Sequence, residues 1–554
     1  MSESPDPAAA PGPLNTAPPE PPQRPSGRSA RLVATGILLS RISGYVRESV
    51  LANYLGTTLH ASAFRAALRL PNVLQNLLGE GTLSASFIPV YSKLLARGDE
   101  RDAGRLAGAI FALLLAAAGA FALLGITLAP VFVRIANPGW EGELRDATIA
   151  CVRIIFPMTG LLVLSAWALG ILNSHRRFLV SYTAPVVWNA AIIVAAFVFG
   201  TRAVGLDLIL ALSWGALIGG ALQFLVQLPW VLRLERSLAP AWDTRSAPVR
   251  QVLRNAGPAV LGRGVVQLSA YLDQILASYL FVGAFAALAF AQTLWLAPIS
   301  LFGMSIAAAE LPEMSREGDD SRAALRVRLE TALQRISFFV MPACVGYIVL
   351  GDIAVAALYQ RGAFLPVDTV LVYMILAAYA TGLIASTTTR LYSSAFYALN
   401  DTRTPARLAA LRVTVAAALG LPLMLVFERF AVQAGTLDVV ANTGDVVALR
   451  PLGVVGLALG SGVAAWVEWV LLRRGIRRET GGLGAGRSLF FRLAFAAGVA
   501  AAAGRALALA MPVLTPLIEA AIVFPVFGLI YVLLAAALRV RQANDVLQTL
   551  RLRR

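Results

Sequence analysis

Several charged residues lie inside stretches of the sequence that are otherwise apolar. Residues 40–48 read Ser-Arg-Ile-Ser-Gly-Tyr-Val-Arg-Glu, and further charges interrupt later apolar stretches. An ionisable residue at the centre of a membrane helix costs roughly 2.5–3.5 kcal/mol on insertion scales, so each one needs a functional or structural reason. The arginines are Arg41, Arg47, Arg263 and Arg390, and the acids are Glu48, Glu80 and Asp273.

The arginines indicate a cavity that binds an anion. A guanidinium stays protonated at every physiological pH, and it binds phosphate or pyrophosphate through two parallel hydrogen bonds. A cationic drug or a metal ion would fit such a cavity poorly. We therefore predict a substrate-binding cavity for a pyrophosphate-bearing headgroup, formed by Arg41, Arg47, Arg263, Arg390 and Ser40.

The acids have two interpretations. Glu48, Glu80 and Asp273 are predicted to act in gating or as ion-pair partners of the cavity arginines. The alternative is that Arg47 pairs with Glu48 or Glu80 and only holds helices together, since a buried charge needs a partner.

The spacing of the arginines leaves their direction open. Arg41 and Arg47 are six residues apart, which is roughly 120° off a common helix face, so a bend at Gly44 is needed to turn both toward one cavity. Arg65 and Arg69 lie one turn apart near the predicted outer end of the next apolar stretch. There a headgroup contact and a cavity role are equally compatible with the sequence.

The sequence gives no sign of catalysis. It contains no P-loop, glycine-rich nucleotide site or metal-ligand cluster. Cys151 and Cys344 lie far apart in apolar stretches, and His60 and His175 stand alone. The acids of the predicted outer loops are scattered, whereas a membrane glycosyltransferase would need them grouped. We predict no enzyme, no cofactor and no metal. The net charge of +16 falls mostly between the apolar runs, so nucleic acid is not a predicted partner.

The elements that carry these residues are membrane helices. Of 554 residues, 58% are apolar and only 14% are charged, which excludes an ordinary soluble protein. Apolar runs long enough to span a bilayer predict fourteen helices, near 31–55, 61–92, 106–135, 147–173, 178–200, 206–232, 252–281, 283–310, 326–350, 367–398, 406–427, 451–472, 487–511 and 513–538. The fold class is all-α, a polytopic membrane protein.

The basic residues predict the orientation. Most Lys and Arg lie in the termini and in the loops on their side of the membrane, and the opposite loops hold six: Arg134, Arg145, Arg202, Arg361, Arg429 and Arg450. Both termini are therefore predicted to be cytoplasmic. The first thirty residues contain nine prolines and no apolar run, which is typical of a disordered tail.

An internal repeat predicts two lobes. Residues 50–55 (Val-Leu-Ala-Asn-Tyr-Leu) resemble residues 275–280 (Ile-Leu-Ala-Ser-Tyr-Leu), and residues 88–93 resemble residues 311–316. Six helices separate the copies, so two six-helix lobes should be related by a pseudo-two-fold axis along the membrane normal, around a central cavity that opens alternately to each side.

The predicted organisation follows from the repeat. It comprises a cytoplasmic tail (1–30), the first lobe (31–233), a cytoplasmic linker (234–250), the second lobe (251–475), two extra helices (487–538) and a basic cytoplasmic tail (539–554).

Several motifs resemble those of the MurJ (MviN) lipid II flippase family, within the multidrug/oligosaccharidyl-lipid/polysaccharide exporter superfamily. They are the run 40–48, Leu70-Pro71-Asn72, Phe87-Ile88-Pro89, Ala184-Pro185 with Asn189, Gly257-Pro258-Ala259, the run 358–364 and the run 396–405, Phe-Tyr-Ala-Leu-Asn-Asp-Thr-Arg-Thr-Pro. They occur in order through the first eleven predicted helices.

The resemblance implies a flippase of the bacterial cytoplasmic (inner) membrane. It would carry the undecaprenyl-pyrophosphate-linked peptidoglycan precursor, lipid II, to the outer leaflet for cell wall biogenesis, with cell-wall synthesis proteins as possible partners. The family's cavity arginines fall on Arg41 and Arg47, and a basic residue of its tenth helix falls on Arg390. Its thirteenth and fourteenth helices form a groove for the lipid tail.

Three positions depart from the family pattern. Ser62 stands in place of an aspartate, and Gln75 and Thr293 stand in place of basic residues. Arg263, on the facing helix, is the candidate replacement for one lost cation. The departures keep two alternatives open, a flippase for another polyprenyl-linked oligosaccharide and a drug exporter of the same superfamily.

Overall fold

The computed structural model describes residues 27–551 except for 239–240, 308–309, 311–313, 315–321, 400, 434–435, 440–449 and 483–486. Within the helices, the side chains of residues 27–34, 70–78, 80–81, 258–259, 261–270, 487 and 549–551 also lie outside the described set. The predicted site residues Glu80 and Arg263 are among them and therefore lie outside the described residues.

Helices make up almost all of the described chain. The first group is α1 (Gly27–Leu55), α2 (Leu59–Leu78), α3 (Glu80–Ala96), α4 (Glu100–Thr127), α5 (Ala129–Ala136), α6 (Gly142–Ser174), α7 (Phe178–Phe199) and α8 (Gly205–Leu234). The second is α9 (Ala247–Ala277), α10 (Ala284–Pro298), the π-helix η1 (Ile299–Met304), α12 (Arg322–Val349), α13 (Gly351–Tyr359), α14 (Pro366–Ala380), α15 (Leu383–Ala398), α16 (Arg403–Phe427) and α17 (Gly453–Glu479). The last is α18 (Arg487–Ala510), α19 (Pro516–Ala537) and α20 (Arg541–Arg551).

The predicted all-helical membrane fold is confirmed. Ten helices in the described part of the chain are long and apolar enough to cross a membrane, and α14 with α15, bent by 43° at their junction, makes an eleventh candidate. The other three predicted spans correspond to α1, to α2 with α3, and to α9. These are helices that carry predicted site charges. The count of fourteen stays a prediction.

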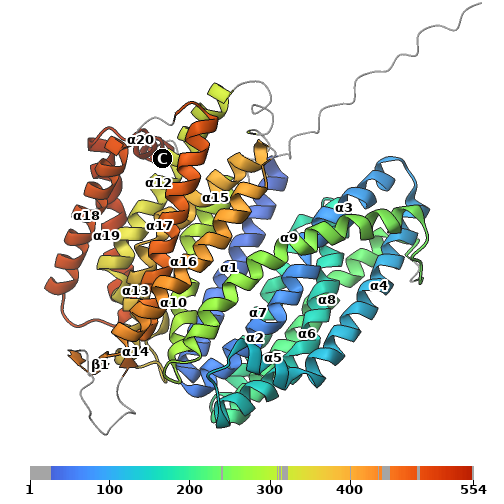
Figure 1. Cartoon of the computed structure of the whole chain (residues 1–554), viewed down its shortest axis with the longest axis horizontal. Helices are drawn as coiled ribbons and strands as arrows, with labels where there is room; N and C mark the ends of the chain where they lie inside the picture. The colour runs from blue at the N-terminus through green and yellow to red at the C-terminus, as the bar shows by residue number, and fades with distance from the viewer. Residues whose placement is uncertain are drawn as a thin grey trace, which may run out of the picture.

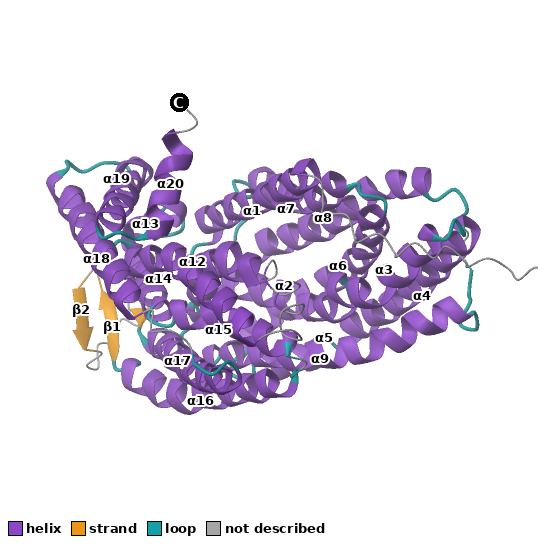
Figure 2. Ribbon diagram, turned by 90° about the horizontal axis from the view of Figure 1, so that it is seen from above, coloured by secondary structure: helices purple, strands orange, loops and turns teal. Residues whose placement is uncertain are grey.

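Two details differ from the sequence expectation. α1 begins at Gly27, inside the predicted tail 1–30, because the residues that follow include good helix formers such as Arg28, Ala30 and Arg31. A small antiparallel sheet, in the order β2-β1-β3, follows α16 (Figure 2). Its strands are β1 (Phe430–Gln433), β2 (Thr436–Val439) and β3 (Arg450–Pro451).

The helices form two lobes that lie side by side (Figures 1 and 2). The first lobe contains α1–α8 and the second contains α10–α17, with α18 and α19 packed on its flank against α12 and α13. α9 runs obliquely between the lobes, since Val249 near its start belongs to a core of the first lobe and Ala277 at its end to a core that both lobes share. α1 begins and the chain ends at the same end of the molecule, here called the terminal end.

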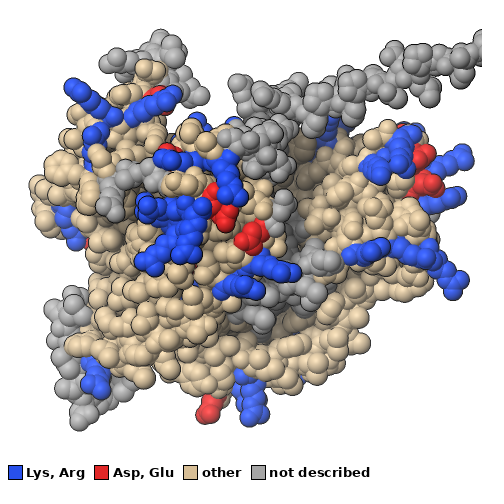
Figure 3. Space-filling model, turned by 45° about the horizontal axis from the view of Figure 1, so that its top comes forward, with Lys and Arg blue, Asp and Glu red and all other residues tan. Residues whose placement is uncertain are grey.

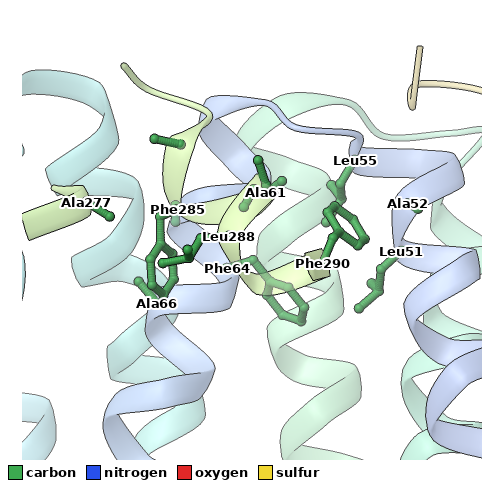
Figure 4. Packing of buried hydrophobic residues seen from close by; sticks show 14 of the residues in the cluster. Leu51, Ala52, Leu55, Ala61, Phe64, Ala66, Ala277, Phe285, Leu288 and Phe290 are labelled. Atoms are coloured by element: carbon green, nitrogen blue, oxygen red, sulfur yellow. The ribbon is translucent and has the colours of Figure 1, made fainter. Parts of the chain in front are cut away.

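The lobes share a hydrophobic core at the opposite end, here called the closed end, which contains the turns 56–58, 278–283 and 360–365. Leu51 and Phe64 of the first lobe pack there with Phe290 and Phe364 of the second, and Figure 4 shows part of this cluster. Toward the terminal end the first lobe has a separate core, and the second lobe forms another with α18 and α19. Figure 3, which brings the terminal end forward, shows a furrow between the lobes.

α2 and α10 contact each other, and each contributes four alanines to the shared core. Small side chains let helix backbones approach closely within a bilayer. Ser62 lies in this contact, where its hydroxyl donates to the Val282 carbonyl oxygen (2.8 Å) and accepts from the Ala286 N–H (3.3 Å). The buried alanines are Ala61, Ala63, Ala66 and Ala67 on α2, and Ala284, Ala286, Ala287 and Ala291 on α10.

Backbone also meets backbone at the closed end. The Ala363 N–H donates to the Asn53 carbonyl oxygen across the lobes (2.8 Å). A Cβ added at Gly283 would collide with the Thr57 carbonyl oxygen, and one at Gly362 would collide with that of Asn53. These turns therefore leave no room for a side chain between the lobes.

We expect Gly283→Ala to loosen the closed end. The backbone of Gly283 has φ −89°, which alanine adopts without strain, so the clash with Thr57 is the main effect. The assay uses a cysteine introduced at buried Ala61. This thiol should react about 5-fold faster with a water-soluble reagent in the Gly283→Ala protein than in the protein with Gly283, because destabilising the closed end by about 1 kcal/mol raises the population of the open form by that factor. Gly119→Ala is the control, because a Cβ there meets nothing within 4 Å. Equal labelling rates in the two variants would contradict this account of the closed end.

Candidate functional site

Arg47 is held by groups of both α1 and α7. Its Nη2 lies 2.7 Å from Oε1 of the adjacent Glu48, and its Nη1 donates to Oδ1 of Asn189 (2.8 Å). Its guanidinium also lies over the Trp188 ring, 4.8 Å from the centroid. Both the carboxylate and the amide orient Arg47, so one part of the ion-pair interpretation, the Arg47–Glu48 pair, is present in the structure.

Glu48 is shared between two arginines. Its second oxygen, Oε2, lies 2.7 Å from Nη2 of Arg65, which comes from α2. The Arg65 side chain is only 9% exposed, and its guanidinium lies over the Phe290 ring of the second lobe, 3.8 Å from the centroid. Arg65 is therefore buried beside Glu48, which does not fit a headgroup contact at the helix end, and its cavity role stays a prediction.

Asn189 joins the polar residues of α1 to α7. Its Nδ2 donates to Ser43 Oγ (2.8 Å) and to the Ser40 carbonyl oxygen (3.4 Å), so the described contact of Ser40 is through its backbone. A side chain at Gly44 would come within 3.9 Å of the same amide. That distance is an ordinary van der Waals contact, and α1 is a single helix that continues through Gly44. The sequence analysis assigned no function to Asn189.

Arg41 reaches the other lobe. Its Nη1 donates to Ser300 Oγ in η1 (2.7 Å), whereas Arg47 lies against α7. The six-residue spacing thus sends the two guanidiniums to different neighbours, one across the furrow and one within the first lobe.

Asp273 of α9 is the repeat-related counterpart of Glu48, since residues 50–55 align with residues 275–280. Its Oδ2 is 3.3 Å from the Tyr379 hydroxyl and 3.5 Å from Nε2 of Gln292, and these two partners bond each other (3.0 Å). These hydrogen-bond donors are neutral, and Asp273 also interacts electrostatically with Arg69 and Arg412.

Arg390 lies on α15 of the second lobe. It is exposed although nearly all of α15 around it is buried. Beside this helix, Arg412 of α16 pairs with the buried Glu468 of α17 (3.1 Å) and lies 3.5 Å from Ser386 Oγ. The sequence analysis missed the Arg412–Glu468 pair, whose residues lie in different predicted spans.

Metal and thiol chemistry have no centre among the described residues. No group of three or more His, Cys, Asp or Glu residues there is arranged to hold a metal ion. Cys151 and Cys344 are both buried and free.

The family model and the relatives found by comparison with known proteins all point to one family. The family model described as lipid II flippase MurJ matches residues 51–524. The probable lipid II flippase MurJ of Bdellovibrio bacteriovorus is 30% identical over 474 residues, covering 82% of this chain and 83% of the relative. The corresponding Haemophilus influenzae protein is 28% identical over 457 residues, covering 80% and 84%.

Solved structures show the same fold. Lipid II flippase MurJ in an inward closed conformation matches with a TM-score of 0.72 at 21% identity, covering 92% of this chain and 99% of that one. An inward-facing multidrug resistance transporter of the MATE family matches with a TM-score of 0.61 at 18% identity, covering 81% and 98%.

Asn189→Ala should destabilise the protein by about 2 kcal/mol, because a hydrogen bond to a charged group contributes about that much and Arg47 loses its acceptor on α7. Denaturant unfolding in detergent measures the change. Thr183→Ala in the same helix is the control, since its hydroxyl donates to the Leu179 carbonyl oxygen of its own helix. The role given to Asn189 is wrong if the two variants unfold at the same denaturant concentration.

Proposed function

This chain belongs to the MurJ family of lipid II flippases, and from that membership we propose that it moves lipid II from the cytoplasmic to the outer leaflet of the bacterial inner membrane. The cargo would be the undecaprenyl-pyrophosphate-linked precursor of peptidoglycan. A chain with ten or eleven candidate spans is a multi-pass membrane protein, as such transport requires.

The observation that carries the proposal is the charge of the α1 site. Among the described residues of this site, three guanidiniums, Arg41, Arg47 and Arg65, stand against one carboxylate, Glu48, and these four groups together carry a net charge of +2. A buried excess of positive charge is costly unless an anion can join it. Pyrophosphate suits it, because guanidinium binds phosphate oxygens bidentately.

The arrangement of cores supports alternating access. The lobes share a core at the closed end, while toward the terminal end they have separate cores on either side of the furrow. The headgroup would enter the furrow from the terminal end, which the Lys and Arg distribution assigns to the cytoplasm. Binding would favour whichever state holds the pyrophosphate better. α18 and α19, on the flank of the second lobe, would receive the lipid tail.

A different sugar head on the same polyprenyl pyrophosphate is the second candidate. Thr293, which stands where the family usually has an arginine, donates its hydroxyl to the Ala289 carbonyl oxygen of its own helix and supplies no cation. Transport of lipid II compared with another polyprenyl-pyrophosphate oligosaccharide in the same vesicles separates the two candidates.

Arg41→Ala and Arg47→Ala should each lower lipid II transport by about 10- to 100-fold in proteoliposomes, because each removes a charged hydrogen-bond donor worth about 1.5–3 kcal/mol. Arg→Lys at either position should retain part of the activity, since an ammonium keeps the charge but not the bidentate fork. The measurement is arrival of head-labelled lipid II at the outer leaflet.

Arg105→Ala is the matched control, because this arginine is exposed and pairs only loosely with Asp102 (3.5 Å). Full transport by folded Arg41→Ala and Arg47→Ala proteins would refute the role of this site in transport. Absence of lipid II transport by the unmodified chain, with transport of another polyprenyl-linked head, would refute the cargo.

A further inference from the structure

The two oxygens of Glu48 serve different helices. Oε1 contacts Arg47 of α1 and Oε2 contacts Arg65 of α2, each at 2.7 Å. Glu48 is only 6% exposed, so its charge is balanced by these neighbours rather than by water. A buried carboxylate with one arginine partner would neutralise that arginine, whereas a carboxylate with two leaves one positive charge over.

Arg65 has a second set of partners in the other lobe. Phe290, over which its guanidinium lies, packs with Tyr359 (4.8 Å between ring centroids) and Phe364 (5.2 Å). A guanidinium on an aromatic face keeps its charge while it is shielded from water. The rings hold Arg65 at the depth of Glu48, and the Tyr359 hydroxyl, which is buried there, has no hydrogen-bond partner among the described residues.

We propose that Arg65 is a positioning residue for the anionic headgroup, which acts through Glu48. By taking one oxygen of that carboxylate, it prevents Glu48 from binding Arg47 with both oxygens and cancelling its charge. Arg47 then keeps an oriented guanidinium, fixed by Asn189, that can bind an incoming pyrophosphate. The proposal rests on the proposed function for the identity of the cargo, but its charge argument applies to any pyrophosphate lipid.

The net charge of the site differs in a definite way between the variants. The unmodified site, Arg41, Arg47 and Arg65 with Glu48, carries +2. Arg65→Ala lowers it to +1 and leaves Glu48 to Arg47 alone. Glu48→Gln raises the net charge to +3. The double variant Arg65→Ala/Glu48→Gln returns it to +2, and no carboxylate at position 48 is then left to pair with Arg47 in place of the headgroup.

The test is binding of undecaprenyl pyrophosphate to the purified full chain in lipid nanodiscs. We expect Arg65→Ala to bind about 10-fold more weakly, which is the factor for about 1.4 kcal/mol. Glu48→Gln should bind at least as tightly as the unmodified chain, and the double variant should recover to within about 3-fold of it. Higher salt should reduce the difference between Arg65→Ala and the unmodified chain.

Two further variants separate charge from packing. Arg65→Lys keeps the charge without the planar stacking on Phe290 and should retain most of the binding. Arg65→Gln keeps a donor for Glu48 but loses the charge, and should bind as weakly as Arg65→Ala. Arg69→Ala removes the next arginine of the same helix, whose guanidinium lies over the Phe285 ring (5.8 Å from the centroid), and Glu48→Gln should not reverse its effect.

The proposal is overturned if folded Arg65→Ala binds undecaprenyl pyrophosphate as the unmodified chain does. It is also overturned if the double variant binds no better than Arg65→Ala, which is the result expected when Arg65 only fastens α2 to α1. Failure of the unmodified chain to transport lipid II, with the binding order intact, would reject the cargo and leave this inference standing. Transport of lipid II without the binding order would reject the inference alone.

Discussion

The structure depends on how charge is balanced inside the membrane helices. Within the described residues, Glu48 forms ion pairs with arginines of two helices, and Asn189 of a third helix fixes one of those arginines. Glu48 and Asn189 thus provide polar partners for arginines that would otherwise be unpaired charges, which are costly in a bilayer. The same contacts set the relative positions of α1, α2 and α7, so the residues that give the site its charge also hold the first lobe together.

The sequence predicted the helices well because apolar length is a strong signal for membrane helices. The helical class and the family were confirmed, and every predicted span corresponds to helices of the structure. Breaks within spans were missed, as between α2 and α3 at Gly79, since hydropathy does not register a change of direction. The small sheet after α16 was also missed, because its strands are only two to four residues long.

The site was harder to predict, because it depends on which way each side chain points. Arg41 and Arg47 were selected correctly as unusual, but the sequence could not show that one contacts Ser300 and the other Asn189. Arg65 did carry a usable signal. Glu48 lies seven residues before the end of α1 and Arg65 six after the start of α2, so a short turn between antiparallel helices brings them to one depth. Arg412 and Glu468 lie in different spans and carried no such signal.

The buried alanines of α2 and α10 have a consequence for how the closed end forms again after the lobes separate. Alanine has no side-chain rotamers to order, so closing this surface costs little side-chain entropy and opening it releases little. Long side chains also cross this contact, since Arg65 and Arg69 of α2 lie over the Phe290 and Phe285 rings of α10. After the lobes separate, the alanines can therefore return to contact without ordering any rotamer, and the two arginine–ring contacts are the long side chains that must be ordered again.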